Sequence, residues 1–312
     1  MNSTTTIENT VSGSRGPELA RNRSVEAVHR STGFHWVGNG FFVSTYFPSA
    51  NLPAERVSPF VLMDYGPAKE FRPLARGKRG VGWHPHRGFE TVTLAFEGSV
   101  AHRDNAGHAD VIGPGDAQWM TAASGIFHEE YHEEELTRRG GRLHMMQLWV
   151  NLPKKDKTAP PNYQPLKSAE FPNVTLPGGG TVRVIAGDFE GAHGPARTFT
   201  PITMLDVRLR AGEKLPVNLP ASYNALAVVA AGRVTAGTTG TASANAGELV
   251  LFANDGERLV LTASEDAHVI VLSGEPIAEP IVQYGPFVMN TIGEIQQAML
   301  DVERGGFGPV PV

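Results

Sequence analysis

The chain has 312 residues, of which 41% are hydrophobic and 19% are charged, as is ordinary for a soluble globular protein. Its formal net charge of −5 offers no basic surface for direct binding of nucleic acid. The sequence has no cysteine, which excludes disulfides, thiolate ligands and cysteine nucleophiles, so His, Asp, Glu or water must hold any metal. No apolar stretch approaches the roughly 20 residues that cross a bilayer, and no signal peptide is recognisable at the N-terminus. We therefore expect a cytoplasmic protein that does not enter membranes.

The first residues, 1–30, are polar and have no periodicity, and we expect them to form a flexible arm. Residues 34–37 and 41–47 flank the turn Gly38-Asn39-Gly40, a pattern that predicts a hairpin. Further short apolar runs follow, separated by Gly-rich turns at intervals of about ten residues. This spacing is typical of an antiparallel sandwich or barrel, which we place at residues 31–155.

A Pro-rich stretch without apolar periodicity divides the chain at residues 156–165, and we interpret it as a linker. A second series of strands follows over residues 166–275. Two short glycine-containing fragments of this series resemble, in order and spacing, two fragments of the first series. The paired fragments are 97–100 with 231–234 and 114–117 with 246–249. We therefore predict an all-β fold of two similar antiparallel barrels.

The C-terminal segment, residues 276–312, contains the one clear helical pattern of the chain. Thr291 and Glu294 have the spacing of a capping box, in which a hydroxyl and a carboxylate satisfy free amides at the helix start. Apolar residues then recur at helical spacing on one face. They are Ile292, Ile295, Met299 and Val302. We expect this amphipathic helix to pack on a barrel.

Two pairs of side chains form a candidate metal site in the first predicted barrel. His84 and His86 lie at the start of a predicted strand, where alternate side chains point to the same face. By the same alternation His128 and Glu130 share a face on a later strand, whereas Glu129 points outward. Three imidazoles and one carboxylate suit Fe(II), Mn, Ni, Co or Cu and leave coordination positions for water, substrate or oxygen.

The spacing of His84, His86 and Glu90 is similar to the first half of the cupin pattern, and Gly125 with His128 is similar to the second half. Longer sequence blocks make the chain resemble one cupin family, the pirins. These blocks are 84–92, 112–128, 147–153 and 274–291.

The resemblance to pirins implies a bicupin of two jelly-roll barrels, with one iron in the N-terminal barrel and no metal ligands in the C-terminal barrel. The implied ligands are His84, His86, His128 and Glu130. It also implies quercetin 2,3-dioxygenase activity, in which O2 opens a flavonol ring and carbon monoxide is released, with Glu130 as both ligand and base. The alternative that it implies is an iron-dependent redox sensor that binds a transcription factor or a metabolic enzyme.

Several side chains near this site have two readings. His132 and His144 could approach the metal, although an ordinary polar role is favoured for each, and Glu90 is placed outside the ligand set. Arg87 either orients a ligand or pairs with an acid. Five apolar side chains could line an aromatic pocket, although core packing is favoured for each. They are Trp83, Phe89, Trp119, Met120 and Phe127.

Overall fold

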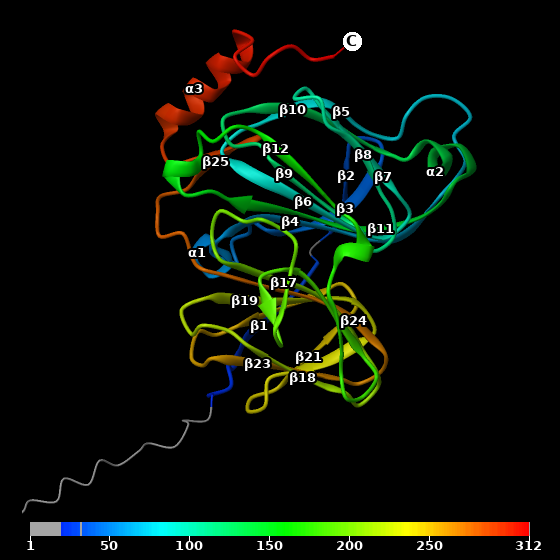
Figure 1. The fold of residues 1–312 in the computed structure, drawn as a ribbon, viewed down its shortest axis with the longest axis vertical. Coiled ribbons are helices and arrows are strands. Elements are labelled where there is room, and N and C mark those ends of the chain that lie inside the picture. Colours follow the sequence, from blue (N-terminus) through cyan, green and yellow to red (C-terminus); the bar gives the residue numbers. More distant parts are fainter. Residues whose placement is uncertain (1–19, 32, 312) are drawn as a thin grey trace, which may run out of the picture.

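Two barrels of antiparallel strands are stacked along the long axis of the molecule (Figure 1), in a computed structural model that describes residues 20–31 and 33–311. Each barrel consists of a seven-stranded sheet that faces a four-stranded sheet. The predicted all-β fold of two antiparallel barrels is therefore confirmed. None of the helices in the described part of the chain has both the length and the apolar character to cross a membrane.

The first barrel contains the candidate metal residues. Its large sheet has the strand order β12 (Asn162–Leu166), β9 (Ala117–Thr121), β6 (Phe89–Glu97), β11 (Gly141–Asn151), β4 (Phe60–Phe71), β3 (Phe41–Phe47) and β2 (His35–Val37). Its small sheet has the order β5 (Gly80–His86), β10 (Ile126–His132), β7 (Val100–Asp104) and β8 (Ala109–Ile112). The predicted hairpin forms as β2 and β3, and Gly38 takes a φ of +59° in the turn, where glycine has no Cβ to clash.

The second barrel repeats this arrangement. Its large sheet has the order β1 (Val25–Arg30), β22 (Glu248–Phe252), β19 (Asn224–Ala231), β24 (Ala267–Gly274), β17 (Ile202–Leu209), β14 (Thr181–Ala186) and β13 (Asn173–Thr175). Its small sheet has the order β18 (Lys214–Asn218), β23 (Arg258–Ala263), β20 (Arg233–Ala236) and β21 (Ala242–Asn245). Two hairpins lie outside the four sheets. They are β15 (Asp188–Phe189) with β16 (Ala192–His193), and β25 (Val282–Tyr284) with β26 (Phe287–Met289).

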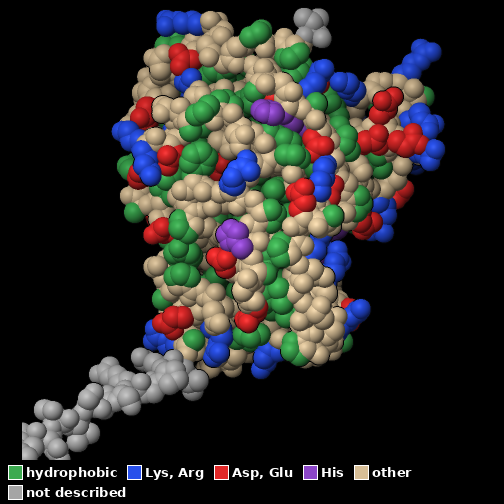
Figure 2. Space-filling model, in the orientation of Figure 1, with side chains coloured by type: hydrophobic (Ala, Val, Ile, Leu, Met, Phe, Trp, Pro, Cys, Tyr) green, Lys and Arg blue, Asp and Glu red, His purple; other side chains and the backbone are tan. Residues whose placement is uncertain are grey.

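Helices form only a small part of the described chain. The α-helices are α1 (Ala54–Val57), α2 (Glu134–Arg139) and α3 (Ile292–Glu303), and two 3₁₀ turns are η1 (Lys154–Asp156) and η2 (Ser168–Glu170). Acidic and basic side chains are interspersed on the face drawn in Figure 2, which has no continuous basic stripe. This mixed surface agrees with the charge balance of the sequence.

The prediction of a flexible arm over residues 1–30 was wrong for its last part, and residues 1–19 lie outside the described residues. Strand β1 pairs with β22 and forms the edge of the second barrel's large sheet (Figure 1). Just before it, Arg23 is 1% exposed and donates hydrogen bonds to the carbonyl oxygens of Tyr223 (2.7 Å) and Pro220 (2.6 Å). Ladder pairing and burial order this segment, even though its sequence is polar.

The expected linker at residues 156–165 is not a free tether either. Its last residues belong to β12, which pairs with β9 in the first barrel. Its start contains Lys157, whose buried ammonium group donates to the Gly88 carbonyl (2.6 Å) and the Asn151 side chain (2.6 Å). Because buried backbone and charged groups require partners, this stretch is part of the barrel wall.

Helix α3 begins with the predicted capping box at Thr291 and Glu294, and half of its predicted apolar face, Ile295 and Val302, packs on the protein. Ile295 and Ala298 are buried, whereas Ile292 is 68% exposed and Met299 is 41% exposed. The buried pair packs against the β25–β26 hairpin and against apolar residues of the first barrel and of the C-terminal tail. The two ends of the described chain thus lie on opposite barrels. The first strand, β1, belongs to the second barrel, and the C-terminal helix, α3, covers the first barrel (Figure 1).

The two large sheets face each other, and apolar side chains fill the space between them. Val92, Leu94 and Trp119 contribute from the first barrel, and Leu226 and Ile270 contribute from the second. In the first barrel the residues between these positions on each strand point the other way, into the barrel. This alternation decides which side chains can reach the candidate metal site.

Candidate metal centre

Three of the four predicted ligands lie together inside the first barrel. Strands β5 and β10 are antiparallel neighbours in the small sheet, and their register places His84 opposite His128. The ring centroids are 4.3 Å apart for His84 and His128, and 4.8 Å apart for His86 and either of the other two. One nitrogen from each ring lies within 4.8 Å of the other two, so the three imidazoles could hold a metal ion.

The hydrogen bonds of these histidines leave nitrogens available for a metal. The Nδ1 atom of His84 lies 2.8 Å from the Gly82 carbonyl, and that of His86 lies 3.3 Å from the Pro286 carbonyl. The Nε2 atom of His128 is buried and has no hydrogen-bond partner among the described residues. A metal would satisfy this atom, because a neutral imidazole nitrogen is a good ligand for divalent transition metals.

Burial keeps two of these imidazoles neutral. The pKa of His86 and the pKa of His128 are well below the usual value, first because burial disfavours the charged ring and second because of the nearby His84. Neutral imidazole is the form that binds a metal, so the environment suits the donor set.

Glu130, the fourth predicted ligand, belongs to an adjoining group with His128 and His102. Its carboxylate accepts hydrogen bonds from the side-chain amides of Gln118 and of Gln147, the latter at 2.9 Å. Glu130 therefore lies next to the three histidines, and hydrogen bonds from two amides of the facing sheet fix the position of its carboxylate. A carboxylate held in this way could bind a metal or accept a proton from a bound molecule.

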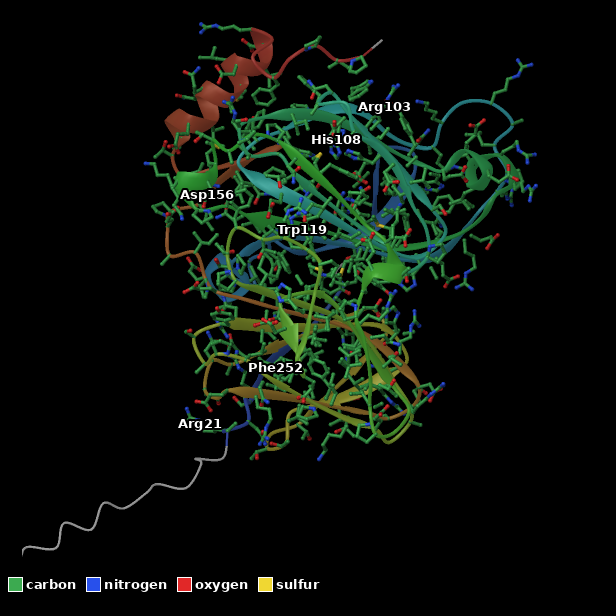
Figure 3. The ribbon with its side chains drawn as sticks, in the orientation of Figure 1. Arg21, Arg103, His108, Trp119, Asp156 and Phe252 are labelled. Carbon is green, nitrogen blue, oxygen red and sulfur yellow. The ribbon has the colours of Figure 1, made fainter. Side chains whose placement is uncertain are left out.

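The chain of side chains behind His128 was not predicted from the sequence. His128 Nδ1 is 3.4 Å from His102 Nδ1, and His102 Nε2 is 3.2 Å from the buried carboxylate of Asp104. Asp104 also lies 2.9 Å from His108 Nδ1. The side chain of His108, labelled in Figure 3, is 37% exposed at the surface of the first barrel. The signal in the sequence was the alternation of His102 and Asp104 on one strand, the same pattern that singled out His84 and His86.

A cavity of about 330 Å³ opens beside His84, His86 and Glu130. Most of its wall is apolar. The apolar lining consists of Val37, Phe41, Val43, Val81, Met145, Trp149 and Pro286. Its other polar side chains are Asp64 and Gln147. A mainly apolar cavity with a few convergent polar groups is typical of a site for a small organic ligand.

None of the five apolar side chains proposed as an aromatic pocket lines this cavity. Phe89, Trp119 and Met120 are fully buried in the core, in agreement with the favoured reading, and Trp119 is labelled in Figure 3. Trp83 lies beneath the Arg103 guanidinium, 5.1 Å from it, and Phe127 packs on Phe307. The cavity uses Trp149 instead, together with residues of the β2–β3 hairpin.

Three other candidates lie away from the metal centre. Glu90 is on the face of β6 toward the second barrel, where its carboxyl accepts a hydrogen bond from Thr121 (2.7 Å). His132 Nε2 is 2.7 Å from the Gly40 carbonyl. His144 Nε2 is 2.8 Å from the Tyr65 hydroxyl. All three side chains are buried, and these hydrogen-bond partners support structural roles for them in place of metal binding.

Arg87 forms an ion pair, the second of its two predicted roles, and connects the C-terminal segment to the strand end beside the candidate metal centre. Its guanidinium lies 2.6 Å from Asp301 on α3 and stacks over the ring of Phe307 at 4.5 Å. On the same segment, the Pro286 carbonyl lies against His86, as described above. The C-terminal segment therefore supports one of the candidate ligands and forms part of the cavity wall.

Comparison with known proteins relates both barrels to one family. A family model described as Pirin matches residues 42–150, and one described as Pirin C-terminal cupin domain matches residues 204–308. A protein of Pseudomonas aeruginosa, provisionally named a quercetin 2,3-dioxygenase, is 48% identical over 286 residues, which are 91% of this chain and 98% of that protein. The protein named Pirin in Mus musculus is 39% identical over 257 residues, 81% of this chain and 84% of that protein.

Solved structures show the same relationship. The crystal structure of quercetin 2,3-dioxygenase from Acinetobacter baumannii is 40% identical, with a TM-score of 0.87 over 93% of this chain and 100% of that chain. A bacterial pirin from Escherichia coli in complex with nickel(II) is 21% identical, with a TM-score of 0.60 over 80% of this chain and 100% of that chain, and shares the fold.

Proposed function

Because this chain belongs to the pirin family, as its motifs predict, we propose that it is a metal-dependent dioxygenase that opens flavonol-type aromatic substrates, with quercetin 2,3-dioxygenase activity. The observation that carries the proposal is the cavity beside His84, His86 and Glu130. It combines an apolar wall for aromatic rings with a cluster of metal-binding side chains at one end. The similarity to proteins named for this activity supports the same assignment.

The proposed cofactor is one divalent transition metal, Fe(II) in the first place and Mn, Ni, Co or Cu as alternatives. His84, His86 and His128 would hold it, with Glu130 as the fourth ligand. When bound, the metal supplies a positive centre that favours the ionised flavonol and couples this electron-rich molecule to O2.

The side chains of the cavity have distinct roles in this proposal. Glu130 accepts the proton of the flavonol 3-hydroxyl group, while Gln118 and Gln147 hold its carboxylate in place. The apolar wall, which includes Trp149, orients the rings and excludes water. One O2 is consumed, the heterocyclic ring opens, carbon monoxide leaves, and the proton returns to the product carboxylate.

The test is flavonol consumption by the metal-loaded protein. We expect His84→Ala to lose bound metal and turnover together, and Glu130→Gln to lose turnover by roughly 10²–10⁴-fold because the base is removed. Elemental analysis and oxygen uptake measure the two effects. His193→Ala, on the surface of the second barrel, is the matched control and should retain both. Wild-type turnover by protein stripped of metal would disprove the mechanism.

A second candidate function is a redox-sensing regulator that binds another protein. A groove of about 800 Å³ supports it, because this groove lies on the outer face of β10, the strand whose inner face carries His128 and Glu130. Arg103, Glu129 and Tyr131 line the groove. Oxidation of Fe(II) to Fe(III) would change the charge behind this strand by one unit. Capture of a transcription factor or metabolic enzyme that depends on iron oxidation state would favour this function over flavonol turnover.

A further inference from the structure

A row of polar side chains crosses the inner face of the first barrel's large sheet. Five neighbouring strands contribute one residue each, in register. The row is Thr45 on β3, Asp64 on β4, Gln147 on β11, Thr93 on β6 and Gln118 on β9. A polar row in a barrel interior costs free energy unless its members are paired, so each member requires a partner.

Three members of the row are paired with the candidate metal centre. Gln118 and Gln147 donate to Glu130, and the Thr93 hydroxyl is 3.4 Å from the same carboxylate. Asp64 belongs to the same row but not to this group. One of its carboxylate oxygens, Oδ1, accepts a hydrogen bond from the Thr45 hydroxyl. The other, Oδ2, accepts no hydrogen bond from the described residues.

Asp64 lines the same cavity as His84, His86 and Glu130, but from the opposite sheet. It is 8% exposed, and most of its neighbours in the cavity are apolar. Burial raises the pKa of the Asp64 carboxyl, because the charged form loses hydration in this setting. A hydrogen bond donated by a bound molecule would restore part of this lost stabilisation.

We propose that Asp64 is a substrate-binding residue, whose free carboxylate oxygen accepts a hydrogen bond from a ring hydroxyl group of the aromatic substrate. The proposal rests on the proposed function and deepens it, because it makes the cavity selective for flavonols that carry hydroxyl groups beyond the 3-hydroxyl. Glu130 and the histidines receive the reacting end of the molecule, and Asp64 receives a hydroxyl on the facing sheet.

The physical basis of this selectivity is the cost of an unpaired carboxylate. An analogue without the ring hydroxyl covers Asp64 with apolar surface, removes its remaining contact with water and gives no hydrogen bond in return. Sites built to pair a hydroxyl group discriminate strongly against analogues that lack it. Asp64 is one strand away from Gln147, roughly 5 Å in a sheet, so one ring system can reach both Asp64 and the Glu130 carboxylate that Gln147 holds.

The experiment compares quercetin with 3-hydroxyflavone, which lacks the other ring hydroxyls. Anaerobic absorbance titrations of metal-loaded protein measure the two dissociation constants without turnover. We expect wild-type protein to bind quercetin roughly 10–100-fold more tightly than 3-hydroxyflavone. Asp64→Leu should bring the two affinities together, chiefly by weakening quercetin. Asp188→Asn, an exposed acid of the second barrel, is the control and should keep the wild-type preference.

A second variant tests whether misfolding, and not the loss of the carboxylate, explains a weaker preference. Asp64→Asn keeps the shape of the side chain but replaces the charged acceptor with a neutral amide, and it should lower the preference by a smaller factor. Metal content and circular dichroism verify that each variant is folded and loaded. Equal binding of the two flavonols by wild-type protein, or an unchanged preference in both Asp64 variants, overturns the role of Asp64 and leaves the proposed function standing. Binding of neither flavonol by metal-loaded wild-type protein overturns both.

Discussion

The two barrels share one strand order but differ in what fills them. In the large sheets, β9-β6-β11-β4-β3 of the first barrel corresponds to β22-β19-β24-β17-β14 of the second. In the small sheets, β5-β10-β7-β8 corresponds to β18-β23-β20-β21. Even the outer strands correspond, because β1 takes beside β22 the place that β12 takes beside β9.

The interiors differ on the strands that carry the candidate metal ligands. In the first barrel, β5 and β10 contribute His84, His86, His128 and Glu130. In the second barrel, the corresponding strands contribute Leu215, Val217, Leu259 and Leu261 to a continuous apolar core. Among the described residues, groups of three or more side chains that could hold a metal ion occur only in the first barrel. The same backbone thus holds a polar site or an apolar core, according to the inward-facing side chains.

This difference suggests a division of roles. Burying an aliphatic side chain contributes about 1.5–3 kcal/mol, so the core of the second barrel is a main source of stability. The polar interior of the first barrel contributes less and retains a cavity. Because the two barrels share a large apolar interface, the second barrel supports the first.

The largest expected effect comes from opening a cavity in the second barrel. Leu261 is fully buried, and Leu261→Ala should lower the free energy of unfolding by about 2–5 kcal/mol. Urea denaturation measures the change. Val111→Ala, at a position of the first barrel that is 43% exposed, should change it by less than about 0.5 kcal/mol. A loss below about 1 kcal/mol for Leu261→Ala would contradict the proposed role of the second core.

A smaller effect is the pH dependence of stability, which we expect to differ between a buried acid of the first barrel and one of the second. Burial raises the pKa of Glu90 in the first barrel to about 7, from 4.5. The folded state therefore holds this proton more tightly, so the contribution is present below pH 4.5 and is lost as the pH rises through about 7. In the second barrel, burial opposes ionisation of Asp206, but His268 and Arg183 outweigh it and lower the pKa to about 2, from 3.8. Its contribution is present above pH 3.8 and is lost as the pH falls through about 2.

Removing these two carboxyl groups should change the free energy of unfolding at opposite ends of the pH range. Glu90→Gln should abolish a loss of about 3 kcal/mol in the free energy of unfolding as the pH rises from 4.5 to about 7. Asp206→Asn should abolish a loss of about 2 kcal/mol as the pH falls from 3.8 to about 2. Urea denaturation across the pH range measures both. Parallel changes in the two variants would contradict this assignment.

The smallest expected effect concerns the support of His128. In Asp104→Asn the carboxylate that His102 faces is lost, and we expect metal affinity to fall roughly 10–100-fold. Competition with a chelator measures this affinity. Asp188→Asn in the second barrel should leave it unchanged, and an effect of Asp104→Asn below about twofold would argue against a role for the His102–Asp104 pair.

Features that depend on neighbouring residues were predictable from the sequence. The Gly38-Asn39-Gly40 turn specified its hairpin, and the pairing of Thr291 with Glu294 marked the start of α3. Strand alternation placed His84 with His86 and His128 with Glu130, since side chains two residues apart share a face, and the resemblance to cupins joined the two pairs. Each of these inferences uses a repeat of two to four residues, which the local backbone geometry fixes.

Features that depend on distant partners were not predictable. Strand β1 looked like an arm because its partner, β22, lies more than 200 residues away. Strand β9 and most of β11 are buried on both faces, and which face turns toward the second barrel depends on how the two large sheets pack. The prediction therefore did not distinguish Trp119, which faces the second barrel, from Trp149, which lines the cavity. His102 was missed for the same reason, because only the pairing of β7 with β10 brings it to His128.

The positions of β1 on the second barrel and of α3 on the first barrel have a consequence for folding during synthesis. During synthesis β1 emerges more than 200 residues before β22, the strand with which it pairs. The first barrel in turn lacks its α3 cover until α3, which follows the strands of the second barrel in the chain, has been made. Pairing over such separations is slow, because the chain must close long loops before any contact rewards it. The second barrel can therefore form only after β22 and β24 have been made, and the candidate metal centre, against which the Pro286 carbonyl lies, is completed later still.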